Sequence, residues 1–144
     1  MTETLYEQDY YLWLEKIASL LRDGRLSELD IPNLLEEIED MGRSQKDALE
    51  SNLVVVLMHL LKYIYQPKLR SNSWRLTIFE HRRRLRKAFK SSPSLKRYFT
   101  EVFNECYQDA RLEASLETGL PQDIFPAQSP FTSEEALNPD YLPD

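Results

Sequence analysis

The stretch from Ser73 to Lys90, SWRLTIFEHRRRLRKAFK, holds the densest group of side chains that can bind a ligand. At helical spacing, one apolar face collects Trp74, Ile78, His81, Leu85, Ala88 and Phe89. The cations cover the rest of the surface: Arg75, Arg82, Arg83, Arg84, Arg86, Lys87 and Lys90. Such groups bind phosphates and carboxylates. The cations are therefore candidate residues for binding nucleic acid or an acidic partner, and Leu76 and Phe79 lie among them, where a phenyl ring can stack on a base.

The charges along the chain are strongly segregated, although the net charge is only −6. Residues 1–61 hold thirteen acids and five bases, residues 62–98 hold twelve bases and one acid, and residues 99–144 hold ten acids and one base. Two interpretations follow. Either the acidic helices pair with the basic one, within a chain or across a dimer, or the basic face is free for a polyanion. The sequence pI near 5 weighs against nucleic acid, because nucleic-acid-binding domains are usually basic.

Two histidines raise the question of a metal or catalytic site. His59 lies in an apolar run and His81 lies on the apolar face of the basic stretch, so we expect both to be neutral and hydrogen-bonded in the core, where they can approach each other. The Glu-x-x-His pair of di-iron bundles does not occur, nor does Cys-x-x-Cys or His-Glu-x-x-His. The sequence therefore predicts no metal ligands and no cofactor.

Arg75 and His81 form an Arg-x5-His sequence that superficially resembles the Arg-x4–6-His motif of helical ribonucleases of the higher-eukaryote-and-prokaryote nucleotide-binding class. On an ideal helix the two residues lie about 120° apart, with His81 turned toward the core. No glycine-rich phosphate loop or Gly-x-Ser-x-Gly elbow occurs, and Cys106 lies on an apolar helix face. We name no catalytic residue and expect no enzyme; a ribonuclease-like or metal-dependent enzyme is a remote alternative.

The composition predicts an all-α protein. The 144 residues include only three glycines, and no alternating strand pattern occurs. We expect a single-domain bundle over residues 1–120 with about four main helices, at about 5–21, 32–65, 73–90 and 93–117. The polar stretch 42–47 can kink the second helix, and the apolar run at 53–61 marks it as a central helix surrounded by others. Thr4 and Glu7 form a capping pair, Ser71 or Ser73 caps the third helix, and Gly24 and Gly119 mark helix ends. Residues 121–144 hold five of the eight prolines and predict an extended tail, pinned to the bundle by Phe125, Phe131, Tyr141 and Leu142.

The single cysteine and the acidic start, MTETLYEQDYY, indicate a reducing cytoplasm and no secretory signal. The longest strongly apolar run, Leu53 to Leu61, has nine residues, whereas a membrane-spanning helix needs about twenty. We therefore expect a cytoplasmic protein that does not enter a membrane.

Several separate motifs carry a family resemblance. They are YEQDYYLWLEKIASLLRDGRLSELDIPNLLEEIEDMGRSQKDALES, then HLLKYIYQP, then SNSWRLTIFEHRRRLRKAFKSSPSL, and finally ETGLP followed by FP. From about Tyr6 to Phe125 the chain resembles the bacterial family called domain of unknown function 29, which is abundant in cyanobacteria. The resemblance implies a compact all-α bundle and a small stand-alone protein, and it implies no activity. Because that family more usually has a glutamine at the position of His81, it also argues against a mechanism that needs His81.

These observations favour a non-enzymatic protein-interaction module that binds a protein partner or forms a homodimer. The alternative is an RNA- or DNA-binding protein that uses the basic face of the helix at 74–90. The charge pattern leaves one question for the structure, which is whether the acids reach the arginines.

Overall fold

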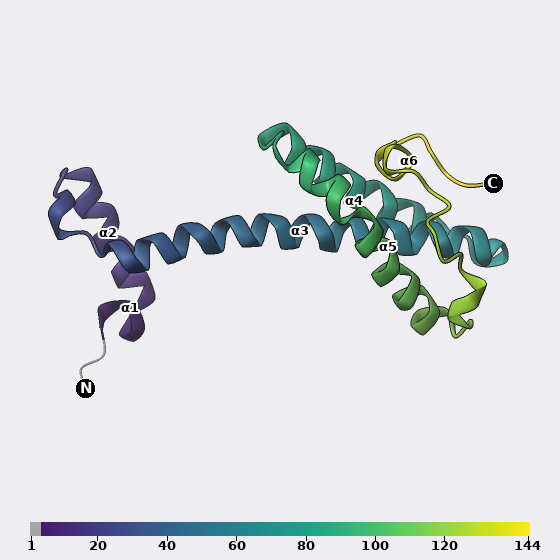
Figure 1. The fold of residues 1–144 in the computed structure, drawn as a ribbon, viewed down its shortest axis with the longest axis horizontal. Coiled ribbons are helices and arrows are strands. Elements are labelled where there is room, and N and C mark those ends of the chain that lie inside the picture. The colour runs from purple at the N-terminus through teal and green to yellow at the C-terminus, as the bar shows by residue number, and fades with distance from the viewer. Residues whose placement is uncertain (1–3) are drawn as a thin grey trace. The chain divides into compact units, whose positions relative to one another are not determined.

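The computed structural model describes residues 4–144 and contains helices and loops, with no strand in this range (Figure 1). The prediction of an all-α helical bundle is confirmed. The α-helices are α1 (Leu5–Gln8), α2 (Tyr10–Arg22), α3 (Ile31–Tyr65), α4 (Asn72–Ser91), α5 (Leu95–Thr118) and α6 (Ser133–Leu137). Single 3-10 turns lie between them: η1 (Leu26–Glu28), η2 (Pro67–Leu69) and η3 (Gln122–Ile124).

The chain divides into two compact units, of which the first ends at Ser44 and the second runs from Gln45 to Asp144. We predicted a bundle over residues 1–120 and a tail over residues 121–144 that packs on it. Residues 121–144 belong to the second unit. The boundary falls inside the polar stretch 42–47, where α3 is helical throughout and shows no break.

The first unit begins with two helices where the periodicity predicted one at 5–21. Asp9 ends α1, and its carboxylate accepts a hydrogen bond from the Leu12 backbone N–H at 3.0 Å, which caps α2. Aspartate side chains compete with the helix for backbone donors in this way. The expected cap at Thr4 is present, since its hydroxyl accepts from the Glu7 N–H at 3.3 Å. Gly24, at φ +70°, ends α2 in the left-handed conformation, as predicted.

Among residues 4–44 of the first unit, only three apolar side chains are buried, and all three lie on α2: Trp13, Ile17 and Leu20. Polar contacts hold the unit to the start of α3. The Trp13 indole N–H donates to Asp30 Oδ2 at 3.1 Å, and the hydroxyls of Tyr6 and Tyr10 both donate to the Glu37 carboxylate. A small apolar core and a polar rim therefore define this unit.

The second unit is built around the C-terminal half of α3. Its apolar run was expected to be surrounded by other helices, and Leu53, Val56, Leu57, Leu60 and Leu61 are fully buried. By length and composition alone, α3 is apolar enough to cross a membrane, and half of its most apolar stretch is buried inside the protein. That stretch forms the core of the second unit, as the central helix of a bundle does.

Helices α4 and α5 and the C-terminal segment cover this run. Ser71 caps α4 as predicted, with its Oγ accepting from the Trp74 N–H at 3.2 Å. Helix α5 begins at Leu95, two residues later than expected, and ends at Gly119 with φ +76°. The two positive-φ glycines thus stand where helices end, as the sequence indicated.

The C-terminal segment is packed and partly helical, so the expectation of a purely extended tail was wrong. Helix α6 starts with a capping box between Thr132 and Glu135. Phe125 and Phe131 are buried as expected, and the Phe131 ring meets the half-buried Tyr141 ring with centroids 6.4 Å apart. Leu142 is at the surface and Pro143 is buried.

Candidate functional site

Helix α4 presents its apolar face to the core of the second unit, as the sequence predicted. Ile78, Leu85 and Phe89 are buried, and Trp74, His81 and Ala88 are half-buried. At the N-terminal end the Lys62 ammonium lies 4.6 Å from the centroid of the Trp74 ring and pairs with Glu117 Oε1 at 2.7 Å. These contacts fix the rotation of α4 and therefore fix which of its residues face solvent.

The outward face of α4 is cationic. Arg83, Arg86, Lys87 and Lys90 are all exposed. Arg86 and Lys87 lie three and four residues after Arg83, and Lys90 lies four and three residues after them, so the four residues form one line along the helix. Together with Ser91 they line a shallow open depression. From Arg83 to Lys90 the line rises about 10 Å at the usual 1.5 Å per residue. Arg75 and Arg84 are exposed to either side of it.

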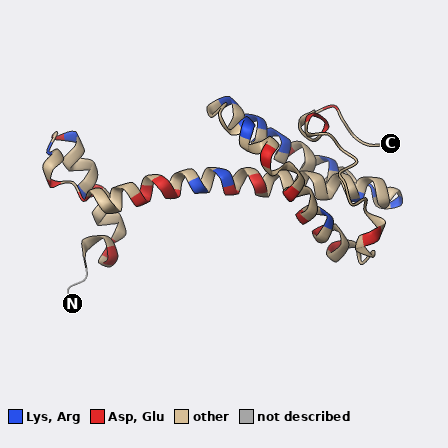
Figure 2. Ribbon diagram, in the orientation of Figure 1, with Lys and Arg blue, Asp and Glu red and all other residues tan. Residues whose placement is uncertain are grey.

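No carboxylate among residues 4–144 pairs with these six α4 cations. The ion pairs in this range are Arg25–Glu28, Arg43 with Glu39 and Asp40, Lys62–Glu117 and Arg97–Glu101. The last two join the basic segment to the acidic one, but neither includes α4. Figure 2 shows the cations grouped along α4 and the acids on α5 and α3. Within the second unit, the acids do not reach the arginines of this face.

Two of the cations have neutral partners. Arg75 Nη1 donates to Asn72 Oδ1 at 2.6 Å, and Arg84 Nη1 lies 3.3 Å from His81 Nε2. Leu76 and Phe79 are half exposed on the same line as Arg83, seven and four residues before it. The outward face is thus apolar at one end and cationic at the other. We name it the α4 outer face: Leu76, Phe79, Arg83, Arg86, Lys87 and Lys90.

Arg82 does not belong to this face, which corrects its assignment as a binding residue. It is only 2% exposed, and its guanidinium donates to three backbone carbonyls: Ala136 O at 2.9 Å, Tyr141 O at 2.7 Å and Glu135 O at 3.1 Å. Burial lowers the pKa of the guanidinium to about 10, so it is still charged at neutral pH. Arg82 is a structural residue that holds the C-terminal segment.

The two histidines are in hydrogen bonds to their own helices, as expected for neutral core residues. The Nδ1 atoms of His59 and His81 lie 2.8 Å from the carbonyl oxygens of Val55 and Thr77. Within residues 4–144 no group of three metal-binding side chains comes together. Arg75 bonds to Asn72, whereas His81 contacts Thr77 and Arg84. The two residues of the Arg-x5-His sequence therefore share no site.

A pH dependence follows from His59. Burial is the main cause that lowers its pKa below the ordinary value of 6.5, and the charges of Lys62 and His81 lower it further. Because the unfolded chain then binds a proton more readily than the fold, His59 supports stability above pH 6.5, and this support is lost as the pH falls. We expect the urea midpoint to drop between pH 7.5 and 5.5, and to drop less in His59→Gln. An equal drop in both proteins would contradict this.

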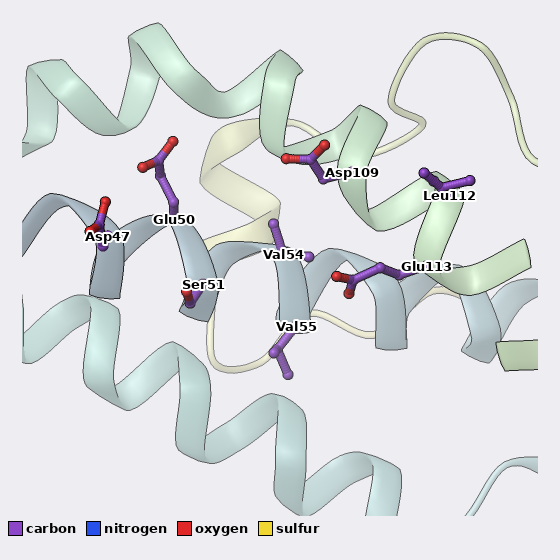
Figure 3. A pocket seen from close by; sticks show the side chains of 8 residues that line it. All are labelled: Asp47, Glu50, Ser51, Val54, Val55, Asp109, Leu112 and Glu113. Atoms are coloured by element: carbon purple, nitrogen blue, oxygen red, sulfur yellow. The ribbon is translucent and has the colours of Figure 1, made fainter. Parts of the chain in front are cut away.

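An acidic groove lies between α3 and α5 and was not predicted from the sequence (Figure 3). Its volume is about 520 Å³, and its carboxylates are Asp47, Glu50, Asp109 and Glu113. Cys106 is buried close by, and burial together with Glu50 raises the pKa of its thiol to about 12. The thiol is therefore protonated and unreactive at neutral pH, consistent with a small buried core residue. These acids lie far apart along the chain, and no sequence pattern indicates that they come together.

A family model described as "Domain of unknown function DUF29" matches residues 5–142 of the chain. No curated protein and no solved structure matches the chain. The comparisons therefore assign a family and leave the role of the α4 outer face to its own chemistry.

Proposed function

The chain belongs to the DUF29 family, whose function is unknown, and from its surface we propose that it is a non-enzymatic module that binds single-stranded nucleic acid on the α4 outer face. One observation carries this proposal: six exposed cations of α4 have no acidic partner within the second unit, residues 45–144. Cations held in fixed positions without a counter-charge release bound anions when a polyanion docks, and this release is the main source of affinity for nucleic acid.

The spacing and the neighbours of the cations favour a nucleic acid over an acidic protein. A single line of Arg83, Arg86, Lys87 and Lys90 can follow one phosphate backbone. Phe79 continues this line and is half exposed, so it offers a ring on which a base can stack. An acidic protein would use the cations and leave the phenyl ring without a role.

The proposal predicts a steep salt dependence. If about four phosphates are neutralised, the slope of log affinity against log salt is about −2.8 for a single strand, and affinity falls about 50-fold between 50 and 200 mM salt. We expect Arg83→Glu with Lys87→Glu to abolish binding at 50 mM salt, and Phe79→Ala to weaken it by about 1–3 kcal/mol. Fluorescence anisotropy of a labelled single-stranded RNA of mixed sequence measures both effects.

The matched control is Lys16→Glu with Arg22→Glu, two exposed bases of α2 that change the net charge by the same amount. This control should bind as the unchanged protein does. Absence of binding at 50 mM salt would overturn the proposal, as would an equal loss in the control. If Phe79→Ala binds as tightly as the unchanged protein, Phe79 does not stack on a base, and the affinity comes from the phosphate contacts alone.

A further inference from the structure

The first unit leaves most of its large apolar side chains uncovered. Seventeen such residues are exposed in the described chain, and ten of them precede Ser44. They are Tyr10, Tyr11, Leu12, Leu14, Leu21, Leu26, Ile31, Leu35, Ile38 and Met41. Of the same unit's described residues, the buried apolar ones are Trp13, Ile17 and Leu20. A unit of about 40 residues with so small a core usually needs an additional source of stability, such as oligomerisation.

The uncovered residues of α3 follow the spacing of a packed helix face. Ile31, Leu35 and Ile38 recur at steps of four and three and are each more than half exposed. With the partly buried Leu34 and the exposed Met41 they form a stripe that contains no charged residue. The same spacing continues along α3 into the second unit as Leu49, Leu53, Val56 and Leu60, all of which are buried. One apolar face of α3 is therefore covered over one half of its length and open over the other.

Helix α2 carries a second open face. Tyr11, Leu14 and Leu21 are exposed, and Tyr11 is the most exposed of them at 71%. They recur at steps of three and seven, which places them about 80° to 160° around the helix from the buried Trp13. The first unit thus has an apolar face on each of its two longer helical segments.

We propose that the first unit binds the first unit of a second copy of this chain, through the stripe of α3 and the open face of α2. A two-fold interface uses one surface twice, so an apolar surface without charges is complementary to its own copy. The two faces together hold seven exposed large side chains, Tyr11, Leu14, Leu21, Ile31, Leu35, Ile38 and Met41. At about half of each side chain they present on the order of 700–800 Å², close to the area of about 800 Å² that each partner contributes to a stable complex. A cationic or anionic partner would find no charged group in the α3 stripe to bind.

The net negative charge of the first unit predicts how its association depends on salt. Up to Ser44 the chain holds eleven acids and four bases, so two first units repel each other at low salt. Apolar contacts must overcome this repulsion, and added salt screens it. We therefore expect the dimer to tighten with salt, whereas binding of nucleic acid to the α4 outer face weakens. The two surfaces share no residue, so failure of either proposal leaves the other standing.

Sedimentation equilibrium of the full chain from 1 to 100 µM, at 150 and 500 mM salt, tests the dimer. We expect a dimer for the unchanged protein and a monomer for Leu35→Glu with Ile38→Glu, with the dissociation constant raised at least 100-fold. The control is Leu112→Glu with Leu116→Glu, which places the same two charges on two exposed leucines of α5 and should remain dimeric. A monomer at 100 µM in the unchanged protein would overturn the proposal, as would a dimer that survives both substitutions.

A second measurement covers the case in which the charged variant loses its helical structure. Ile38→Cys introduces an exposed thiol, while the native Cys106 is buried and stays reduced. Mild oxidation should join two chains of Ile38→Cys into a covalent dimer at 10 µM. Leu116→Cys, at the same concentration, should stay a monomer on a denaturing gel. No covalent dimer from Ile38→Cys, or equal amounts from both variants, would show that the α3 stripe does not face a second copy.

Discussion

Replacing Arg82 with methionine is expected to lower the free energy of unfolding by about 3 kcal/mol and to release the C-terminal segment. The substitution keeps the apolar stem and removes the guanidinium, which donates to the carbonyls of Glu135, Ala136 and Tyr141. Buried carbonyls that lose their donor cost about 1–3 kcal/mol each, reduced where water can replace the donor. The carbonyls near the end of α6 also lose a cation at the negative end of the helix dipole.

Urea denaturation measures the loss, and limited proteolysis beyond residue 120 reports the release. Arg82→Lys should be nearly as unstable as Arg82→Met, because one ammonium group does not reproduce the planar guanidinium that donates to three carbonyls. The control is Arg83→Met, next in sequence and exposed, which should change stability by no more than about 0.5 kcal/mol. If Arg82→Met behaves like this control, the guanidinium does not hold the segment.

Phe125→Ala should cost about 4 kcal/mol, since truncation of a fully buried phenylalanine removes its transfer free energy and leaves a cavity. The Phe125 ring has no exposed surface and meets the Tyr65 ring edge to face at 5.3 Å. Its position is fixed on both sides: Arg111 Nε donates to Phe125 O at 3.0 Å, and the Tyr107 hydroxyl donates to Pro126 O at 2.6 Å. The local backbone therefore cannot easily collapse into the cavity.

The comparison residue is Ile124, which precedes Phe125 and is 47% exposed. Ile124→Ala should shift the thermal midpoint only slightly, whereas Phe125→Ala should shift it by more than 10 °C. Similar shifts for both would mean that the segment after Gly119 contributes little to the core, contrary to the burial of Phe125, Phe131 and Ala136.

The long helices could be predicted because their apolar residues repeat over many turns. The run at Leu53–Leu61 is apolar all round and is the core of the second unit. Gly24 and Gly119 mark helix ends because only glycine takes positive φ without strain, and both have it. Short elements lack such a signal. Helix α6 has five residues, too few for a period, although Thr132 and Glu135 carry a readable capping pattern.

Among the predicted binding residues, Arg82 is buried, whereas binding by the others stays a prediction. Arg82 was grouped with its basic neighbours, yet it stands four residues after Ile78, three before Leu85 and seven before Phe89, which is the spacing of the buried face. That interpretation relied on the charge of the arginine and not on its position along the helix. Whether the other cations are paired could not be predicted, because it depends on which acids of distant segments come near, and this is set by tertiary packing.

The boundary between the two units at Ser44 could be predicted only in part from the sequence. The polar stretch 42–47 predicted a bend, whereas the helix continues and the change is in what surrounds it. Periodicity describes which side of a helix is apolar, but it does not say where along the helix neighbours are present. The open stripe at Ile31, Leu35 and Ile38 has the same pattern as the covered one, and only the structure separates them.

The packing of the C-terminal segment has a consequence for the order of events during synthesis. Arg82 bonds to carbonyls 53 to 59 residues later in the chain, and Phe131 and Ala136 complete a core that begins at Leu49. Helices α3, α4 and α5 are therefore translated before the residues that cover them. While translation continues through these residues, the second unit exposes apolar surface, and its folding can finish only after Tyr141 has left the ribosome.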